Sequence, residues 1–161
     1  MLYLFWGIMM DNKDYLANIL PHKKPMILID DIVSYSLEDK WLKTCVTITE
    51  NSMFYNKETK GIDSVVGIEF MAQTIGCYAY FKKNLSEPQI GFLLGTRLYN
   101  NAIEKFELDK TYYILVKEVF VAEIYSFECF IYNEENEEVA SATINVYQDD
   151  DNNIEKGALN G

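Results

Sequence analysis

Residues 64–84, SVVGIEFMAQTIGCYAYFKKN, decide the fold of this chain. Turn-forming and charged residues bound the stretch, with KETKGID before it and LSEP after it. Nearly every position is apolar or small, which is typical of a helix that is buried on all sides. About 20 helical residues span roughly 30 Å, the width of a small domain. The stretch therefore predicts one long central helix wrapped by the rest of the chain.

One acid, Glu69, interrupts this apolar stretch. A buried carboxylate costs free energy unless it is paired or hydrogen-bonded, so Glu69 is a first candidate for function. The alternative is an acid that only stabilises the helix N-terminus through the helix dipole. Gln73 follows one turn later, and Gly76 and Tyr80 extend the same face. The small Gly76 would let another helix or a ligand come close.

The flanking sequence is mostly of β type. Residues 11–20 predict a short amphipathic helix that ends at Pro21. Alternating or compact apolar runs predict a strand start at 26–29 and strands at 41–50, 90–99, 111–121, 123–132 and 138–148. Residues 51–63 and 100–110 are predicted loops. One long helix against five or six antiparallel strands is an α+β plan, with the helix on one face of the sheet.

The length of 161 residues fits one domain. Met10 opens a cleaner start than Met1, so we interpret residues 1–9 as an upstream-start or lead segment, 10–148 as the domain and 149–161 as an acidic flexible tail. The apolar lead LYLFWGIMM is too short to span a membrane. The net charge of -11 argues against nucleic acid as a partner, because phosphate binding needs clustered basic residues.

The three cysteines, Cys45, Cys77 and Cys129, have neither disulfide nor metal-site spacing. Each lies in an apolar segment, so we expect buried free thiols in a reducing compartment, the cytoplasm. The sequence contains no pattern typical of a metal cluster, a phosphate loop or a serine nucleophile. Arg97, the only arginine, lies in a predicted strand, where a surface ion pair is a better interpretation than a substrate contact.

His22 is the only histidine. Lone histidines are usually structural. Here, however, Pro21 and Pro25 stiffen the loop around it, and the charges of Lys23 and Lys24 favour a neutral ring that can act as a base. His22 is therefore a second candidate for chemistry.

Two motifs resemble a known family. LPHKKPMILIDDI resembles the LPHRxPxLLxD opening of 3-hydroxyacyl-[acyl-carrier-protein] dehydratases, and GIEFMAQTIG resembles their central-helix EAMAQ segment. A weaker likeness continues through GFLLGTRLYNNAIEKF, so the resemblance covers roughly residues 10–148. The chain looks most similar to the smaller dehydratase-like branch found with aryl-polyene and related polyketide lipid clusters.

The resemblance implies a hotdog fold, in which a five- to six-stranded antiparallel sheet wraps a long helix. It also implies a homodimer or heterodimer with a shared site, and an acyl thioester delivered on the phosphopantetheine arm of an acyl carrier protein, with no other cofactor. In the family a histidine removes the Cα proton, an acid helps the 3-hydroxyl leave as water, and backbone N–H groups near the helix start stabilise the thioester oxyanion. Glu69 matches that acid, and Gly67 lies near such an amide.

The sequence departs from the family at the loop histidine. The corresponding segment, MFYNKETKGIDSVVG, has Tyr55 at that spacing, followed by Asn56 and Lys57. Three alternatives stay open: His22 replaces the missing base, Tyr55 or Lys57 does a different job, or the site is silent and the chain partners an active dehydratase.

The hypothesis that the resemblance favours is a dehydratase of fatty-acid or aryl-polyene/polyketide lipid biosynthesis. Glu69 and His22 would be catalytic, and Gly67, Gln73, Tyr55 and Gly76 would bind substrate. The alternatives are a non-catalytic hotdog subunit and a thioesterase in which the carboxylate activates water. Because acyl carrier proteins are acidic, docking would need a local basic patch, which we expect from Lys23, Lys24, Lys57, Lys60, Lys82 and Lys83.

Overall fold

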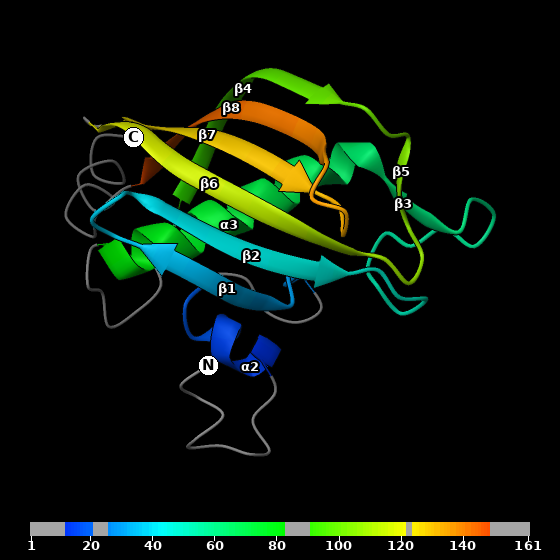
Figure 1. The fold of residues 1–161 in the computed structure, drawn as a ribbon. Helices are drawn as coiled ribbons and strands as arrows, with labels where there is room; N and C mark the ends of the chain where they lie inside the picture. Colours follow the sequence, from blue (N-terminus) through cyan, green and yellow to red (C-terminus); the bar gives the residue numbers. More distant parts are fainter. Residues whose placement is uncertain (1–11, 21–25, 83–90, 122–123, 149–161) are drawn as a thin grey trace, which may run out of the picture.

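A computed structural model describes residues 12–20, 26–82, 91–121 and 124–148. Six antiparallel strands form one sheet in the order β1-β2-β6-β7-β8-β4 (Figure 1). The strands are β1 (Asp31–Ser36), β2 (Trp41–Thr47), β4 (Gly91–Asn101), β6 (Thr111–Val121), β7 (Ile124–Tyr132) and β8 (Glu138–Gln148). The predicted α+β plan is confirmed.

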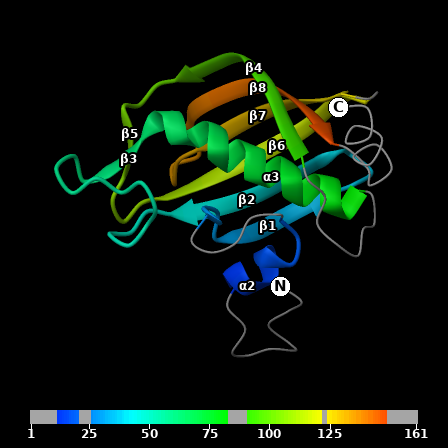
Figure 2. The same ribbon diagram turned by 180° about the vertical axis from the view of Figure 1, so that it is seen from behind.

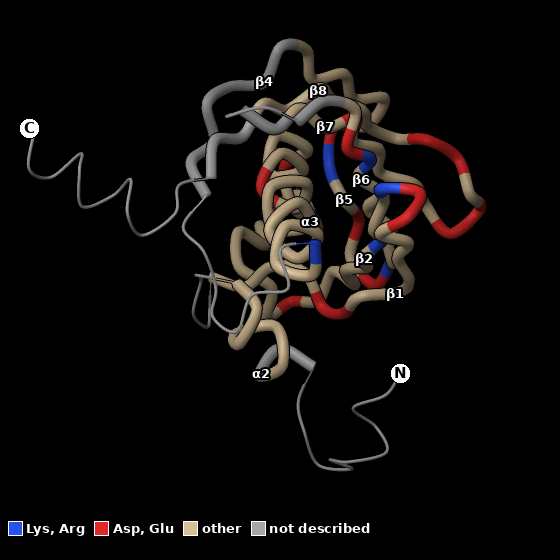
Figure 3. Tube along the Cα trace, turned by 90° about the vertical axis from the view of Figure 1, so that its left-hand side faces the viewer, with Lys and Arg blue, Asp and Glu red and all other residues tan. Residues whose placement is uncertain are grey.

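The central helix α3 (Gly67–Lys82) lies across one face of this sheet (Figure 2). A 3-10 turn, η1 (Ser64–Val66), leads into it, and the Asp63 side chain caps that turn by accepting a hydrogen bond from the Val65 N–H at 2.9 Å. Viewed nearly along α3, the sheet curves round one side of the helix (Figure 3). The short helix α2 (Asn12–Ala17) contacts β1, below the sheet in Figure 1.

The core between α3 and the sheet follows from strand alternation. In β2 the side chains of Leu42, Thr44 and Val46 are buried and their neighbours are half-buried, as the alternation predicted. The buried Thr44 hydroxyl hydrogen-bonds the Thr74 hydroxyl of α3 at 2.7 Å, so even the polar inward residue has a partner. The large buried side chains of the helix, Phe70 and Tyr78 among them, fill the space against these strands.

Several boundaries differ from the prediction because they depend on long-range pairing. Residues 26–29 are not a strand, and the helix proper begins at Gly67 rather than at residue 64. Two regions predicted as loops contain short strands, β3 (Gly61–Asp63) and β5 (Lys105–Glu107), which pair with each other as a second sheet. No local pattern marks these short segments, since each is stabilised mainly by its distant partner.

The predicted lead (1–9) and tail (149–161) lie outside the described residues. Among the helices that the structure describes, none combines the length and apolar character that crossing a membrane requires.

Candidate functional site

Glu69 lies in the first turn of α3 and is exposed in this chain. The expectation that its carboxylate is buried is therefore wrong for the single chain. The sheet covers one side of α3 and leaves a stripe at helical spacing less covered. We call this the open stripe; its members, each half-buried or exposed, are Val65, Ile68, Glu69, Ala72, Gly76 and Tyr80. The helix is apolar all round, but this chain does not cover it all round.

Gln73 lies one turn after Glu69 and is 1% exposed. Its side-chain oxygen accepts the N–H of Leu28 at 2.9 Å, and its amide nitrogen donates to the carbonyl of Met26 at 2.7 Å. Both ends of the amide therefore bind main chain, and they hold residues 26–29 against α3 as a neighbouring strand would. This segment directly follows residues 21–25, which contain His22 and lie outside the described residues.

Gly76 allows the close approach predicted for it, and the neighbour is part of the chain itself. A Cβ atom at Gly76 would lie 2.8 Å from Cδ2 of Leu20. Leu20 follows α2 in one further turn, in which its N–H bonds the Leu16 carbonyl at 2.8 Å. The N-terminal segment thus covers part of the helix face that begins at Glu69.

Gly67 faces the sheet, away from the open stripe. A Cβ atom there would meet the Tyr99 hydroxyl, and Ile131 and Phe106 at 3.1 Å. Its N–H donates to the carbonyl of Ser64 within the 3-10 turn. The expected oxyanion-binding amide is therefore already used inside the chain in this structure.

The loop that lacks the family histidine contains a feature that the sequence does not signal. Phe54 has a φ of 69° and is 52% exposed. A bulky residue in the left-handed region is a genuine outlier, and such strain gathers at functional sites. The next residue, Tyr55, is half-buried and packs against the core. Phe54 therefore joins Tyr55 as a candidate on this loop.

The predicted basic patch is only partly described. Lys57 and Lys60 are exposed on the turn that precedes β3. Lys82 instead forms an ion pair with Glu118 of β6, whose side chain is 1% exposed. Lys23, Lys24 and Lys83 lie outside the described residues.

Glu118 was missed at the sequence level, although a signal was present. It shares the inward face of β6 with Val116 and Ile114, two and four residues earlier. The Tyr78 hydroxyl lies beside this pair, and burial, together with the Glu118 charge, raises the pKa of Tyr78. The cluster lies at the opposite end of α3 from Glu69, so it belongs to the packing of the helix C-terminus.

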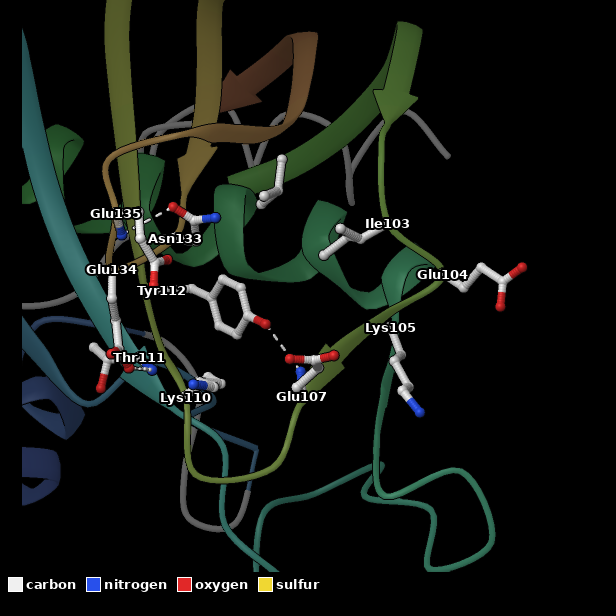
Figure 4. A pocket seen from close by; sticks show the side chains of 11 residues that line it. Ile103, Glu104, Lys105, Glu107, Lys110, Thr111, Tyr112, Asn133, Glu134 and Glu135 are labelled. Atoms are coloured by element: carbon white, nitrogen blue, oxygen red, sulfur yellow. Dashed lines mark hydrogen bonds between the residues drawn. The ribbon is translucent and has the colours of Figure 1, made fainter.

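A solvent-open groove of about 400 Å³ lies where β5, β6 and the β7–β8 connection meet (Figure 4). Tyr112 forms part of its wall, and its hydroxyl accepts the Glu107 N–H at 3.0 Å. Acidic side chains outnumber basic ones in the lining, which consists of Ile103, Glu104, Lys105, Glu107, Lys110, Thr111, Tyr112, Asn133, Glu134, Glu135 and Val139. Glu69 is not among them.

The cysteines are free thiols, as predicted: Cys77 and Cys129 are buried and Cys45 is half-buried. Burial raises the pKa of Cys45 to about 11 and that of Cys77 to about 12, so neither is a ready nucleophile at neutral pH. Within the described ranges, no group of three His, Cys, Asp or Glu side chains is placed to hold a metal ion.

Comparison with known proteins gives a consistent picture. A family model described as "ApeP-like: ApeP dehydratase" matches residues 15–156. The bifunctional enzyme LpxC/FabZ of Chlorobaculum tepidum is 35% identical over 82 residues, which are 48% of this chain but only 17% of that enzyme.

Two solved structures share the fold. The dehydratase heterocomplex ApeI:P from Xenorhabdus doucetiae contains a chain that superposes with a TM-score of 0.77 at 24% identity, over 88% of this chain and 95% of its own. A hypothetical thioesterase with coenzyme A from Streptococcus pneumoniae gives a TM-score of 0.57 at 14% identity, over 76% and 88%. These matches confirm the hotdog fold.

Proposed function

The chain belongs to the ApeP-like dehydratase family, and we propose that it works as one subunit of a dehydratase that removes water from a 3-hydroxyacyl thioester on an acyl carrier protein. The observation that carries this proposal is the position of Glu69. It is the only acid of α3, it lies in the first turn, and it is exposed on a stripe that is otherwise apolar or small. An apolar surface with one carboxyl group suits an acyl chain and one proton-transfer step.

The chemistry needs two proton transfers. A base removes a proton from Cα, the electron pair forms the Cα–Cβ double bond, and the hydroxyl leaves from Cβ. Glu69 gives a proton to that hydroxyl, so that it departs as water.

A second hotdog subunit would complete the site. Val65, next to the helix start, is 58% exposed, and Leu98 on β4 is 62% exposed. β4 is the last strand in the sheet order, so one of its edges can pair with another chain. A partner on this edge would also approach the open stripe and exclude water from Glu69. One similar solved structure is a dehydratase heterocomplex, which supports a paired arrangement.

The base can come from either of two sources. His22 is the only histidine of the chain, and the segment after its loop is held on α3 by Gln73, one turn from Glu69. The loop before β3, where the family has its histidine, has none. If His22 is not the base, the partner subunit supplies it and this chain contributes Glu69 and part of the acyl surface.

Carrier docking would rest on exposed lysines beside this loop. Lys57 and Lys60 lie on the turn before β3, and Lys105 from β5 donates a hydrogen bond to the Thr59 carbonyl of that turn. The three side chains therefore belong to one end of the molecule, near the start of α3. These lysines would supply the positive charge that an acidic carrier needs, although Glu58, Asp63, Glu104 and Glu107 are exposed at the same end.

The test is dehydration of a 3-hydroxyacyl carrier substrate by the purified chain, alone and with a co-expressed hotdog partner. We expect Glu69→Gln to abolish water loss while leaving folding intact, because Glu69 is exposed. His22→Asn separates the two base sources: lost activity assigns the base to this chain, and retained activity assigns it to the partner. Dehydration that persists in Glu69→Gln would contradict the proposal, and release of free thiol instead of water would favour a thioesterase.

A further inference from the structure

Tyr99 lies where the edge strand β4 passes the start of α3. The register of β4 against β8 shifts between Thr96 and Leu98, and Tyr99 then pairs with Ala142. Such irregularities re-aim the side chains that follow them. Leu98 is 62% exposed, whereas Tyr99 is half-buried and packs against the core. Of these two neighbouring residues of the edge strand, Leu98 thus faces solvent and Tyr99 faces the start of α3.

The Tyr99 hydroxyl donates a hydrogen bond to the Ser64 carbonyl, the first residue of the 3-10 turn that leads into α3. The Ser64 N–H is also held, since it donates to the Glu104 carbonyl at 3.0 Å. Burial, followed by the Asp63 charge, raises the pKa of Tyr99 to about 12, so the hydroxyl keeps its proton as a donor at neutral pH.

Gly67 makes room for this contact. A Cβ atom at residue 67 would lie too close to the Tyr99 hydroxyl for both to keep their places. Any side chain there would push the hydroxyl away from Ser64. The glycine and the tyrosine therefore form an interlocked pair on the turn immediately before Glu69.

We propose that Tyr99 is a positioning residue that ties the first turn of α3, and hence Glu69, to the edge strand β4. The inference rests on the proposed function in one respect: β4 is the strand on which a second subunit would pair. A partner bound at β4 would then hold Glu69 in register with its own residues. Gly67 belongs to this device through the space it leaves for the hydroxyl.

Tyr99→Phe removes the hydroxyl and keeps the ring. Tyr112→Phe is the control, because Tyr112 is a buried tyrosine whose hydroxyl also makes one backbone hydrogen bond, in which it accepts the Glu107 N–H. In the full chain, alone and with its partner, we expect Tyr99→Phe to speed amide hydrogen exchange over residues 65–69 about fivefold to tenfold, the effect of losing one hydrogen bond. Tyr112→Phe should leave the exchange rates of residues 65–69 unchanged.

Catalysis provides the second readout. Tyr99→Phe should lower kcat at nearly constant KM, because Glu69 is misplaced while the acyl surface persists. Gly67→Ala should do the same, and adding Tyr99→Phe to Gly67→Ala should cost little more, since both changes break one contact. If Gly67→Ala does not fold, the hydrogen-exchange comparison of Tyr99→Phe with Tyr112→Phe still tests the inference.

Exchange over residues 65–69 that is the same in Tyr99→Phe and Tyr112→Phe would overturn the inference. Faster exchange with an unchanged kcat would also overturn it, because the contact would then be structural only. If the wild-type complex shows no dehydration, the proposed function fails, while the exchange comparison still tests the link between β4 and α3.

Discussion

The backbone N–H of Leu28 donates to the side-chain oxygen of Gln73 at 2.9 Å, although 45 residues separate the two. The other end of the same amide donates to the Met26 carbonyl at 2.7 Å. One buried side chain therefore provides the hydrogen bonds that a neighbouring strand would otherwise give to residues 26–29. This places the segment after His22 one helical turn from Glu69.

Replacing Gln73 by leucine should destabilise the protein by about 1–3 kcal/mol, because it leaves the buried Leu28 N–H without a partner and also removes the part-buried bond to the Met26 carbonyl. Denaturant unfolding followed by circular dichroism measures this loss. Gln73→Glu keeps the size of the side chain and the acceptor for the Leu28 N–H. It replaces the donor to the Met26 carbonyl by a second acceptor, so it should also lower the unfolding free energy. A leucine variant as stable as the wild type would contradict the role of Gln73.

The pair of Lys82 and Glu118 should respond asymmetrically to mutation. Glu118 is 1% exposed and Lys82 is 32% exposed at the side chain. Lys82→Met leaves a buried carboxylate without its partner and should cost about 3–5 kcal/mol. Glu118→Gln leaves a lysine that can turn toward water and should cost about 1 kcal/mol. The unfolding free energies of the two variants, measured side by side, test this difference. Equal losses in Lys82→Met and Glu118→Gln would show that Glu118 is better solvated than its burial indicates.

Phe54→Gly should be more stable than Phe54→Ala by about 1 kcal/mol. Both variants lose the exposed ring, but only glycine adopts a φ of 69° without strain. The same comparison at Ser52, which is not among the positive-φ residues, should favour alanine. Thermal and denaturant unfolding of the four variants measure the two differences. If alanine is favoured at both positions, Phe54 is not strained.

Stability should fall with alkaline pH because the folded state raises the thiol pKa values. The pKa of Cys77 rises from 9.0 to about 12 and that of Cys45 to about 11, mainly through burial. The folded chain then binds more protons than the unfolded chain, so this stabilisation is complete below pH 9 and is lost as pH rises toward 11–12. The Tyr99 hydroxyl, raised to about 12, adds to the loss above pH 10.

Unfolding free energies measured from pH 8 to 11 test this slope, and Cys77→Ala should make it shallower. Alkylation kinetics provide a second check: in the native protein at pH 8 all three thiols should react slowly, with the half-buried Cys45 reacting first. Fast labelling of Cys77, or the same slope in Cys77→Ala, would contradict the assignment.

Much of the fold could be predicted because its signals are local. Alternation identified β2 and its buried face, and the strands at 111–121 and 138–148 have the predicted bounds. The long apolar stretch identified α3. The short strands β3 and β5 escaped prediction because each is three residues long and is stabilised by the other, about 40 residues away in the chain.

The candidate site was likewise predicted only in part from the sequence. Helical spacing predicted that Glu69, Gln73 and Gly76 share one face of α3, and in the structure Glu69 is exposed whereas Gln73 is buried. It also predicted a close approach at Gly76, where Leu20 lies. It did not reveal that Gln73 binds main chain or that the Tyr99 hydroxyl fills the space beside Gly67, since these contacts join elements far apart in sequence.

Local sequence patterns were enough to identify a long apolar helix with one acid, the strands that alternate against it, and the motifs that resemble a dehydratase. The exposure of Glu69 on the open stripe became apparent only in the folded chain. The physical reason is that composition states how apolar a helix is, whereas the position of the sheet and of the N-terminal segment decides which side is covered. The remaining side is left for a substrate or a second subunit, and the carboxyl group of Glu69 lies there.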